Sequence, residues 1–135
     1  MDLLARREHS QFELRRKLKA KGYIENLIDA VLCDLTKENL QSDQRFAESY
    51  VSMRTKRGYG PLRIAAELRE RGIKDDIINQ FTNKNDAQWG TEAILVREKK
   101  FGTAVPISLK ERVKQSKFLQ YRGFNTQQIK SALEG

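Results

Sequence analysis

The sequence predicts an all-α fold: an elongated array of three tandem three-helix repeats. Apolar residues recur at helical spacing, and no stretch shows the sustained period-two alternation between hairpin turns that is typical of strands. Three glycines that end predicted helices recur in register, since Gly22 and Gly72 are 50 residues apart and Gly72 and Gly123 are 51 residues apart. Each has a leucine four residues before it and an isoleucine six residues after it: Leu18, Leu68, Leu119, Ile28, Ile78 and Ile129. The register predicts three repeats: residues 1–40, 41–84 and 85–135.

The first repeat has only a short first helix, followed by two clearly marked helices. Ser10 and Glu13 match a capping box, in which the serine side chain accepts from the Glu13 amide and the Glu13 side chain accepts from the Ser10 amide. The helix that begins there is expected to end at Gly22, which suits a left-handed position. Cys33 lies off the apolar stripe of the next helix. That stripe consists of Leu27, Ile28, Val31, Leu32 and Leu35.

The second repeat begins with a helix that Ser42 can cap. Its apolar face is broad enough to be buried: Phe46, Ala47, Tyr50, Val51 and Met53. The run Gly58-Tyr59-Gly60-Pro61 breaks this helix. Pro61 suits the first position of the next helix, because the N–H that proline lacks would be unpaired there. That helix is expected to end at Gly72, and a shorter apolar helix follows with these residues: Ile73, Ile77, Ile78 and Phe81.

The third repeat begins with a helix from about Asp86 to Gly102, with Trp89 and Phe101 on its core-facing side. The loop from Gly102 to Ser108 has no counterpart in the first two repeats. We therefore expect this loop to be a feature of the third repeat alone.

Two further helices complete the third repeat. Ser108 and Glu111 match a second capping box, which predicts a helix that ends at Gly123. Asn125 or Thr126 can cap the last helix.

Four segments in this order resemble the signatures of the RecX family. The opening Leu4-Ala5-Arg6-Arg7-Glu8-His9-Ser10-Gln11-Phe12-Glu13-Leu14 is similar to the start of RecX proteins. Ser42-Asp43-Gln44-Arg45-Phe46-Ala47-Glu48-Ser49-Tyr50-Val51 resembles the second signature, and Gly58-Tyr59-Gly60-Pro61-Leu62-Arg63-Ile64 continues it. Phe118-Leu119-Gln120-Tyr121-Arg122-Gly123-Phe124 is similar to the closing signature. The resemblance extends from residue 4 to residue 133.

The resemblance implies a regulator of the RecA recombinase. Such a protein would bind the groove of the RecA filament on single-stranded DNA and restrain filament growth, ATP hydrolysis, strand exchange and co-protease activity. It would act as a cytoplasmic monomer without a cofactor, and whether it also touches DNA directly stays open. The short first helix is a departure from the family pattern that puts the amino-terminal contact surface in doubt.

Composition excludes several classes of protein. No run approaches the roughly 18 consecutive apolar residues of a membrane span, and the amino end lacks the core of a signal peptide. A single cysteine cannot form an internal disulfide, which suits a reducing cytoplasm. His9 and Cys33 are the only residues of their types, so no metal-ligand pattern is present, and no motif suggests a catalytic triad or a phosphate-binding loop. We therefore expect no catalysis.

Positive charge is the main functional signal. The chain has 26 Lys and Arg against 18 Asp and Glu, and the excess is +1, +3 and +4 in the three repeats in turn. Such charge favours an acidic or polyanionic partner. Tyr59 is either a core residue or an exposed interface anchor. The residues expected to bind the partner are Arg15, Arg16, Arg45, Arg54, Lys56, Arg57, Tyr59, Arg63, Lys114, Lys117 and Arg122. Two alternatives stay open: a basic helical module that binds DNA without RecA, and a scaffold for another acidic protein.

Overall fold

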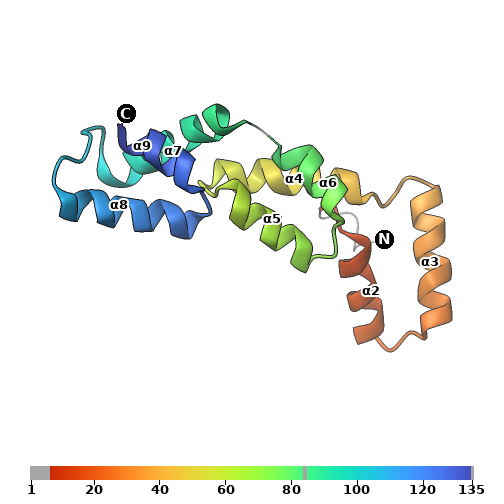
Figure 1. Cartoon of the computed structure of the whole chain (residues 1–135). Coiled ribbons are helices and arrows are strands. Elements are labelled where there is room, and N and C mark those ends of the chain that lie inside the picture. The colour runs from red at the N-terminus through yellow and green to blue at the C-terminus, as the bar shows by residue number, and fades with distance from the viewer. Residues whose placement is uncertain (1–6, 84, 135) are drawn as a thin grey trace. The chain divides into compact units, whose positions relative to one another are not determined.

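The computed structural model of the chain describes residues 7–83 and 85–134, and these residues form helices and turns without a strand among them (Figure 1). The all-α prediction is therefore confirmed. The helices are α2 (Gln11–Ala20), α3 (Glu25–Lys37), α4 (Asp43–Lys56), α5 (Pro61–Glu70), α6 (Asp75–Thr82), α7 (Asp86–Phe101), α8 (Leu109–Arg122) and α9 (Thr126–Glu134). The short first helix expected at the amino end, and the Leu4-Ala5-Arg6 start of the first signature, lie outside the described residues.

The chain divides into two compact units. Unit 1 consists of Met1–Tyr50 and Glu67–Phe81, and unit 2 consists of Val51–Ala66 and Thr82–Gly135. The helices α4 and α5 therefore each contribute residues to both units.

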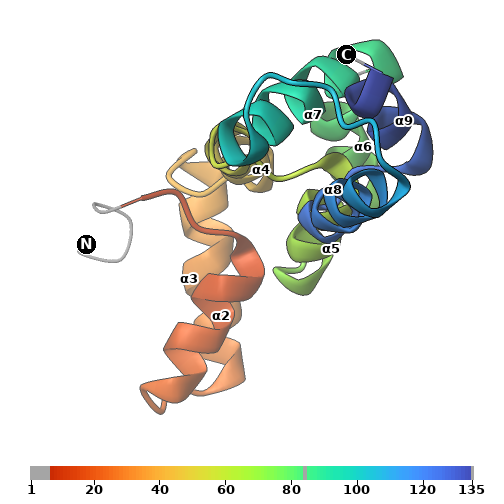
Figure 2. The ribbon, with the colours of Figure 1, turned by 90° about the vertical axis from the view of Figure 1, so that its left-hand side faces the viewer.

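Unit 1 contains a helical hairpin of α2 and α3, which run antiparallel on either side of a turn (Figures 1 and 2). Gly22 makes the turn with a φ of 91°, a left-handed conformation that glycine adopts without a steric penalty. The apolar stripes of the two helices meet in a core of Leu14, Ile28, Leu32 and Leu35, with Leu18 and Val31 packed against it. Leu27 departs from the predicted stripe, since 47% of its surface is exposed.

Unit 2 is built on α7, which packs against α9 and α8. Trp89 is buried, and its Nε1 donates a hydrogen bond of 3.1 Å to the carbonyl oxygen of Thr82. Ala93 of α7, Leu119 of α8 and Ala132 of α9 are fully buried. Phe101 is only partly buried and packs edge to face on Phe118. The core-facing prediction holds for Trp89 and only in part for Phe101.

Met53 corrects the predicted face of α4. Phe46, Ala47 and Val51 are buried as expected, and Tyr50 is half-buried, but Met53 is 38% exposed. At about 100° per residue, Met53 lies roughly 20° beyond Phe46, just outside the arc that Phe46, Ala47 and Val51 define. The face that is buried is therefore narrower than the face that is apolar.

Most helix starts follow the predicted caps. Ser10 and Glu13 form the reciprocal capping box, and Ser42 accepts from the amide of Arg45. Helix α7 begins at Asp86 as predicted, and Asn85 caps it in a reciprocal arrangement with Gln88. Each cap occupies hydrogen-bond donors that the first turn leaves unpaired.

The last two helix starts differ from the prediction in detail. Ser108 accepts from the Glu111 amide, but the Glu111 side chain accepts a bond from Gln115 rather than from the Ser108 amide, so only half of the predicted capping box forms. Of the two predicted caps for α9, Asn125 is the one used, with its Oδ1 2.8 Å from the Gln128 amide nitrogen.

Candidate partner-binding site

The net positive charge of the chain lies entirely in unit 2. Unit 2 contains 14 Lys and Arg residues against 5 Asp and Glu residues, a formal charge of +9, whereas unit 1 contains 12 against 13, a formal charge of −1. A division by predicted repeats only shows a gradual rise along the chain. The division into compact units shows that one of them is basic and the other is close to neutral.

Ion pairing separates the two units in the same way. Among the described residues of unit 1, ion pairs 2.7 to 3.9 Å long neutralise basic side chains: Arg7–Glu13, Arg15–Glu25, Arg15–Asp29, Lys19–Glu25, Arg45–Glu8, Arg69–Asp75 and Arg71–Glu13. In the described part of unit 2, the exposed lysines form no ion pair with a carboxylate: Lys56, Lys99, Lys100, Lys110, Lys114 and Lys117. The charge of unit 2 is therefore available to a partner to a greater degree than the charge of unit 1.

Two of the sequence signatures meet inside unit 2. The amide of Gly60 donates to the carbonyl oxygen of Arg122 over 2.7 Å, and the amide of Leu62 donates to the carbonyl oxygen of Gly123 over 3.0 Å. The two backbones approach so closely that a Cβ on Gly60 would lie 2.6 Å from the Gly123 carbonyl carbon. Gly123 is left-handed, with a φ of 100°. This contact, which we call the glycine clasp, joins the turn between α4 and α5 to the end of α8.

Side chains reinforce the glycine clasp in both directions. Arg122 donates from Nη1 to the carbonyl oxygen of Arg57 over 3.0 Å, and Arg63 donates from Nη1 to the carbonyl oxygen of Tyr121 over 3.2 Å. Two guanidinium groups are thus held in fixed positions by backbone carbonyls. Fixed cations lose little conformational entropy when they bind an anion.

Tyr59 lies at the centre of an arginine cluster. The guanidinium carbons of Arg54, Arg63 and Arg122 are 3.8, 4.5 and 4.9 Å from the centre of the Tyr59 ring. Cations within about 6 Å of an aromatic face are attracted by the quadrupole of the ring. Tyr59 is half-buried, so it is neither the core residue nor the exposed anchor that the sequence left open. It is instead the platform that gathers three predicted contact residues.

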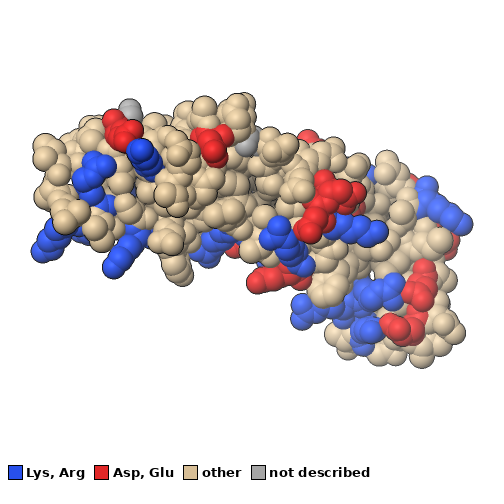
Figure 3. Space-filling view, in the orientation of Figure 1, with Lys and Arg blue, Asp and Glu red and all other residues tan. Residues whose placement is uncertain are grey.

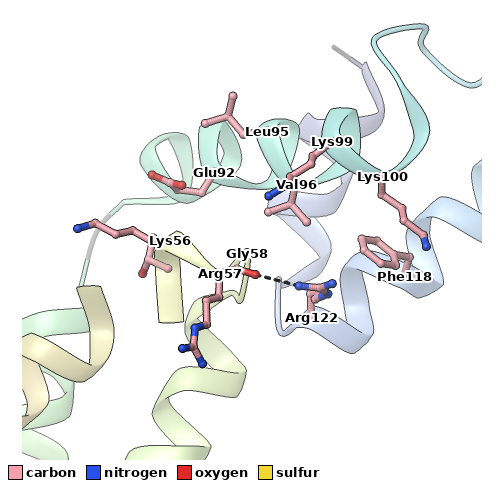
Figure 4. Close-up of a pocket in the computed structure, with 11 residues that line it drawn as sticks. Lys56, Arg57, Gly58, Glu92, Leu95, Val96, Lys99, Lys100, Phe118 and Arg122 are labelled. Carbon is pink, nitrogen blue, oxygen red and sulfur yellow. Dashed lines mark hydrogen bonds between the residues drawn. The ribbon is translucent and has the colours of Figure 1, made fainter. Parts of the chain in front are cut away.

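A cleft of about 390 Å³ opens beside this cluster (Figure 4). Its walls come from the end of α4, from α7 and from α8, all in unit 2. The basic cleft, as we call it, is lined by Thr55, Lys56, Arg57, Gly58, Glu92, Leu95, Val96, Lys99, Lys100, Phe118 and Arg122. Five of these side chains are cationic and one is acidic, so the cleft favours an anionic occupant.

Phe118 gives the basic cleft an aromatic wall. Lys100 extends from α7 towards α8, with its Nζ 5.9 Å from the Phe118 ring centre, and the guanidinium carbon of Arg122 lies 5.0 Å from the same centre (Figure 4). Arg122 therefore belongs to both the arginine cluster and the cleft. Lys99, Lys100 and Phe118 were not among the predicted contact residues, although the adjacent lysines in the last turn of α7 were a visible signal.

The other predicted contact residues are not in this site. Lys114 and Lys117 lie on α8 in unit 2, and Lys114 approaches the Phe101 ring at 5.9 Å. Arg15, Arg16 and Arg45 lie in unit 1. Arg15 and Arg45 form ion pairs there, and Arg16 lies over the ring of Phe12 at 5.8 Å. These three arginines already have partners in their own unit.

His9 is a buried structural residue rather than an exposed base. Its Nδ1 is 3.0 Å from the carbonyl oxygen of Arg7 and its Nε2 is 3.0 Å from the Nζ of Lys17. A neutral ring that donates from Nδ1 and accepts at Nε2 satisfies both contacts. Burial, reinforced by the positive charges of Lys17 and Arg7, lowers the pKa of His9 below its usual value of 6.5.

Two negative findings concern the part of the chain that the structure describes. No group of three or more His, Cys, Asp or Glu side chains in residues 7–83 and 85–134 could hold a metal ion. No helix among the same residues is both long and apolar enough to cross a membrane.

Comparison with known families shows the class of repeat protein to which the chain belongs. Three family models match in tandem: "RecX, first three-helix domain" over residues 1–35, "RecX, second three-helix domain" over 42–80 and "RecX, third three-helix domain" over 92–133. The chain is thus a helical repeat protein with three tandem three-helix domains, as its glycine register predicts.

Similarity to individual proteins shows the family of the chain. The chain is 43% identical over 130 residues to "Regulatory protein RecX" of Halorhodospira halophila, covering 96% of this chain and 81% of the relative. It is also 43% identical to the protein of that name from Pseudomonas savastanoi pv. phaseolicola, over all of this chain and 87% of the relative. The crystal structure of RecX from Lactobacillus salivarius superposes with a TM-score of 0.84 at 23% identity, covering 98% of this chain and 88% of that one. The chain belongs to the RecX family, and these relatives are named as regulators rather than as enzymes.

Proposed function

We propose that this protein is a negative regulator of RecA that binds the groove of the RecA filament on single-stranded DNA. Binding would restrain filament growth, ATP hydrolysis, strand exchange and co-protease activity. Membership of the RecX family supports the partner, and the gathering of +9 in unit 2 supports the mode of contact. We further propose that it acts as a cytoplasmic monomer without a cofactor and without catalysis, which its single exposed free thiol, Cys33, fits.

The basic cleft is the observation that carries the proposal. Its cations have no carboxylate partner among the described residues, and its volume of about 390 Å³ admits a nucleotide-sized or side-chain-sized anionic group. The mechanism is competitive occupancy: several modest contacts to acidic groups along the filament add up, because each neutralised phosphate contributes separately. A filament that carries the bound protein cannot then grow or rearrange freely.

The test removes charge from the cleft without touching the glycine clasp. The triple variant Lys56→Gln, Lys99→Gln, Lys100→Gln changes three exposed lysines. Contacts of roughly 0.5 kcal/mol each sum to about 1.5 kcal/mol, which is about a tenfold loss of affinity. We expect half-inhibition of RecA ATP hydrolysis on single-stranded DNA to need about ten times more of the variant than of the wild type.

A matched control separates the cleft from net charge. The triple variant Lys21→Gln, Lys37→Gln, Lys74→Gln removes the same charge from exposed lysines of unit 1. It should inhibit like the wild type at physiological salt. Equal weakening of both triple variants would mean that total charge, and not the cleft, decides binding.

Direct binding to bare DNA is the second candidate function. Basic side chains beside the aromatic wall of Phe118 are the combination that single-strand binding proteins use for phosphates and bases. This candidate predicts equal affinity for DNA with and without RecA. It also predicts that the logarithm of the binding constant falls linearly with the logarithm of the salt concentration, with a slope of about −0.7 for each phosphate contacted on a single strand.

A further inference from the structure

Helix α8 exposes apolar residues on the side that faces solvent. Its buried side carries Gln115 and Leu119, which are 3% and 0% exposed, whereas Leu109 and Tyr121 are 78% and 76% exposed. At about 100° per residue, Leu109, Val113 and Tyr121 lie within an arc of roughly 120° on the side of the helix opposite Gln115 and Leu119. Helix α8 therefore leaves large apolar side chains in solvent while it buries a polar one.

Ile107 extends this apolar face beyond the start of the helix. It precedes the Ser108 cap and is 93% exposed. An apolar residue in this position normally packs on the fourth residue of the helix, but here that residue is Arg112. Ile107 therefore has no apolar neighbour at the position where one would serve the helix start.

Basic residues are interleaved with the apolar ones. Lys110, Lys114 and Lys117 are exposed on the same outward side of α8, and none of them pairs with a carboxylate among the described residues. In the space-filling view, Lys and Arg side chains project along the edge of unit 2 that α8 forms (Figure 3). The surface is thus both apolar and positively charged.

The mixture of side chains distinguishes the occupant. Single exposed apolar residues are ordinary, but several large ones on one helix face mark a surface that another molecule covers. A nucleic-acid backbone would use the lysines and would leave Ile107, Leu109 and Val113 in water. A protein surface that carries carboxylates beside apolar side chains would use both sets of residues.

We propose that the outer α8 surface docks an acidic protein surface that presents its own apolar side chains. This outer α8 surface consists of Ile107, Leu109, Lys110, Val113, Lys114, Lys117 and Tyr121. The inference rests on the proposed function, in which that protein surface belongs to the recombinase subunits of the filament. It assigns the protein contact to this surface, separately from the anion contact in the basic cleft.

The test uses the double variant Ile107→Asn, Leu109→Gln in the full chain. Its control is Ile24→Asn, Leu40→Gln, which changes two residues of the same types in unit 1 that are 70% and 49% exposed. Affinity is measured for RecA filaments on single-stranded DNA and for the same DNA without RecA. We expect the double variant to lose about tenfold in filament affinity, with the control unchanged and with any binding to bare DNA unchanged.

Each other outcome overturns the inference. Filament affinity equal to that of the control would show that the surface is not used, while the proposed function would stand. Equal losses on filament and on bare DNA would assign the surface to nucleic acid. A wild-type dimer in sedimentation that the double variant abolishes would assign it to a second copy of the chain. No binding of the wild type to filaments would refute the proposed function and this inference together. Unchanged thermal unfolding of both variants is expected, because all four side chains are exposed.

Discussion

The glycine clasp gives the sharpest prediction about the fold. In Gly60→Ala, the new Cβ would lie 2.6 Å from both the carbonyl carbon and the oxygen of Gly123, and 2.7 Å from the amide nitrogen of Phe124. Gly60 does not have a positive φ, so alanine suits its backbone and the whole cost is steric. Backbone atoms cannot swing aside as a flexible side chain can. The two segments must therefore separate by several tenths of an ångström or more.

Separation weakens the hydrogen bonds that hold the clasp. The bonds from Gly60 to Arg122 and from Leu62 to Gly123 are 2.7 and 3.0 Å long, and each contributes roughly 1 kcal/mol. Overpacking adds about 1–3 kcal/mol. We expect Gly60→Ala to lower the free energy of unfolding by about 3 kcal/mol, which corresponds to a fall in Tm on the order of 10 °C.

Gly90→Ala is the matched control, because Gly90 lies inside α7 and its new Cβ would lie 3.5 Å from Ser131 Cβ, an ordinary contact. Alanine in a helix interior should stabilise the protein by up to about 1 kcal/mol. Urea unfolding followed by circular dichroism measures both variants. A Gly60→Ala protein within about 0.5 kcal/mol of the wild type would refute the reasoning about the clasp.

Two other predictions concern buried polar groups. Burial lowers the pKa of His9, so near pH 6.5 the unfolded chain binds a proton more readily than the folded chain, and stability is lost as the pH falls through 6.5. The free energy of unfolding of the wild type should therefore fall relative to that of His9→Gln between pH 8 and pH 5. A difference between the two proteins that does not depend on pH would contradict this prediction. Arg97 is buried and donates to the carbonyl oxygens of Ala132 and Ala104 over 2.9 and 3.1 Å. In Arg97→Lys, the lysine lacks the planar guanidinium that makes both bonds, so the free energy of unfolding measured with urea should fall by about 2 kcal/mol. A variant as stable as the wild type would show that the two bonds do not contribute to stability.

Local sequence predicted the features that local physics determines. The left-handed glycines Gly22, Gly72 and Gly123 end helices as expected, because a residue without Cβ adopts a positive φ without a steric penalty. The caps at Ser10 and Ser42 could also be predicted from local sequence, because each cap joins two residues that are three positions apart. The repeat boundaries at residues 40 and 84 stay a prediction.

Contacts between distant segments could not be predicted in this way. The sequence placed Gly60 in one signature and Gly123 in another, but nothing local indicated that their backbones touch. The position of Tyr59 stayed open because its surroundings come from three different helices or turns. Arg97 resembled any other basic residue of a helix, although it is 1% exposed. Burial of an arginine depends on carbonyl groups that the fold supplies from elsewhere in the chain.

The central claim is that the protein recognises the RecA filament and does so through unit 2. The most direct measurement compares the affinity of the wild type for RecA filaments on single-stranded DNA with its affinity for the same DNA alone, at two salt concentrations. We expect at least about tenfold tighter binding to the filament than to bare DNA. Filament affinity should fall as salt rises, and it should fall less steeply for the Lys56→Gln, Lys99→Gln, Lys100→Gln variant. Equal affinity for the filament and for bare DNA, with the same salt dependence, would contradict recognition of the filament and favour a DNA-binding module.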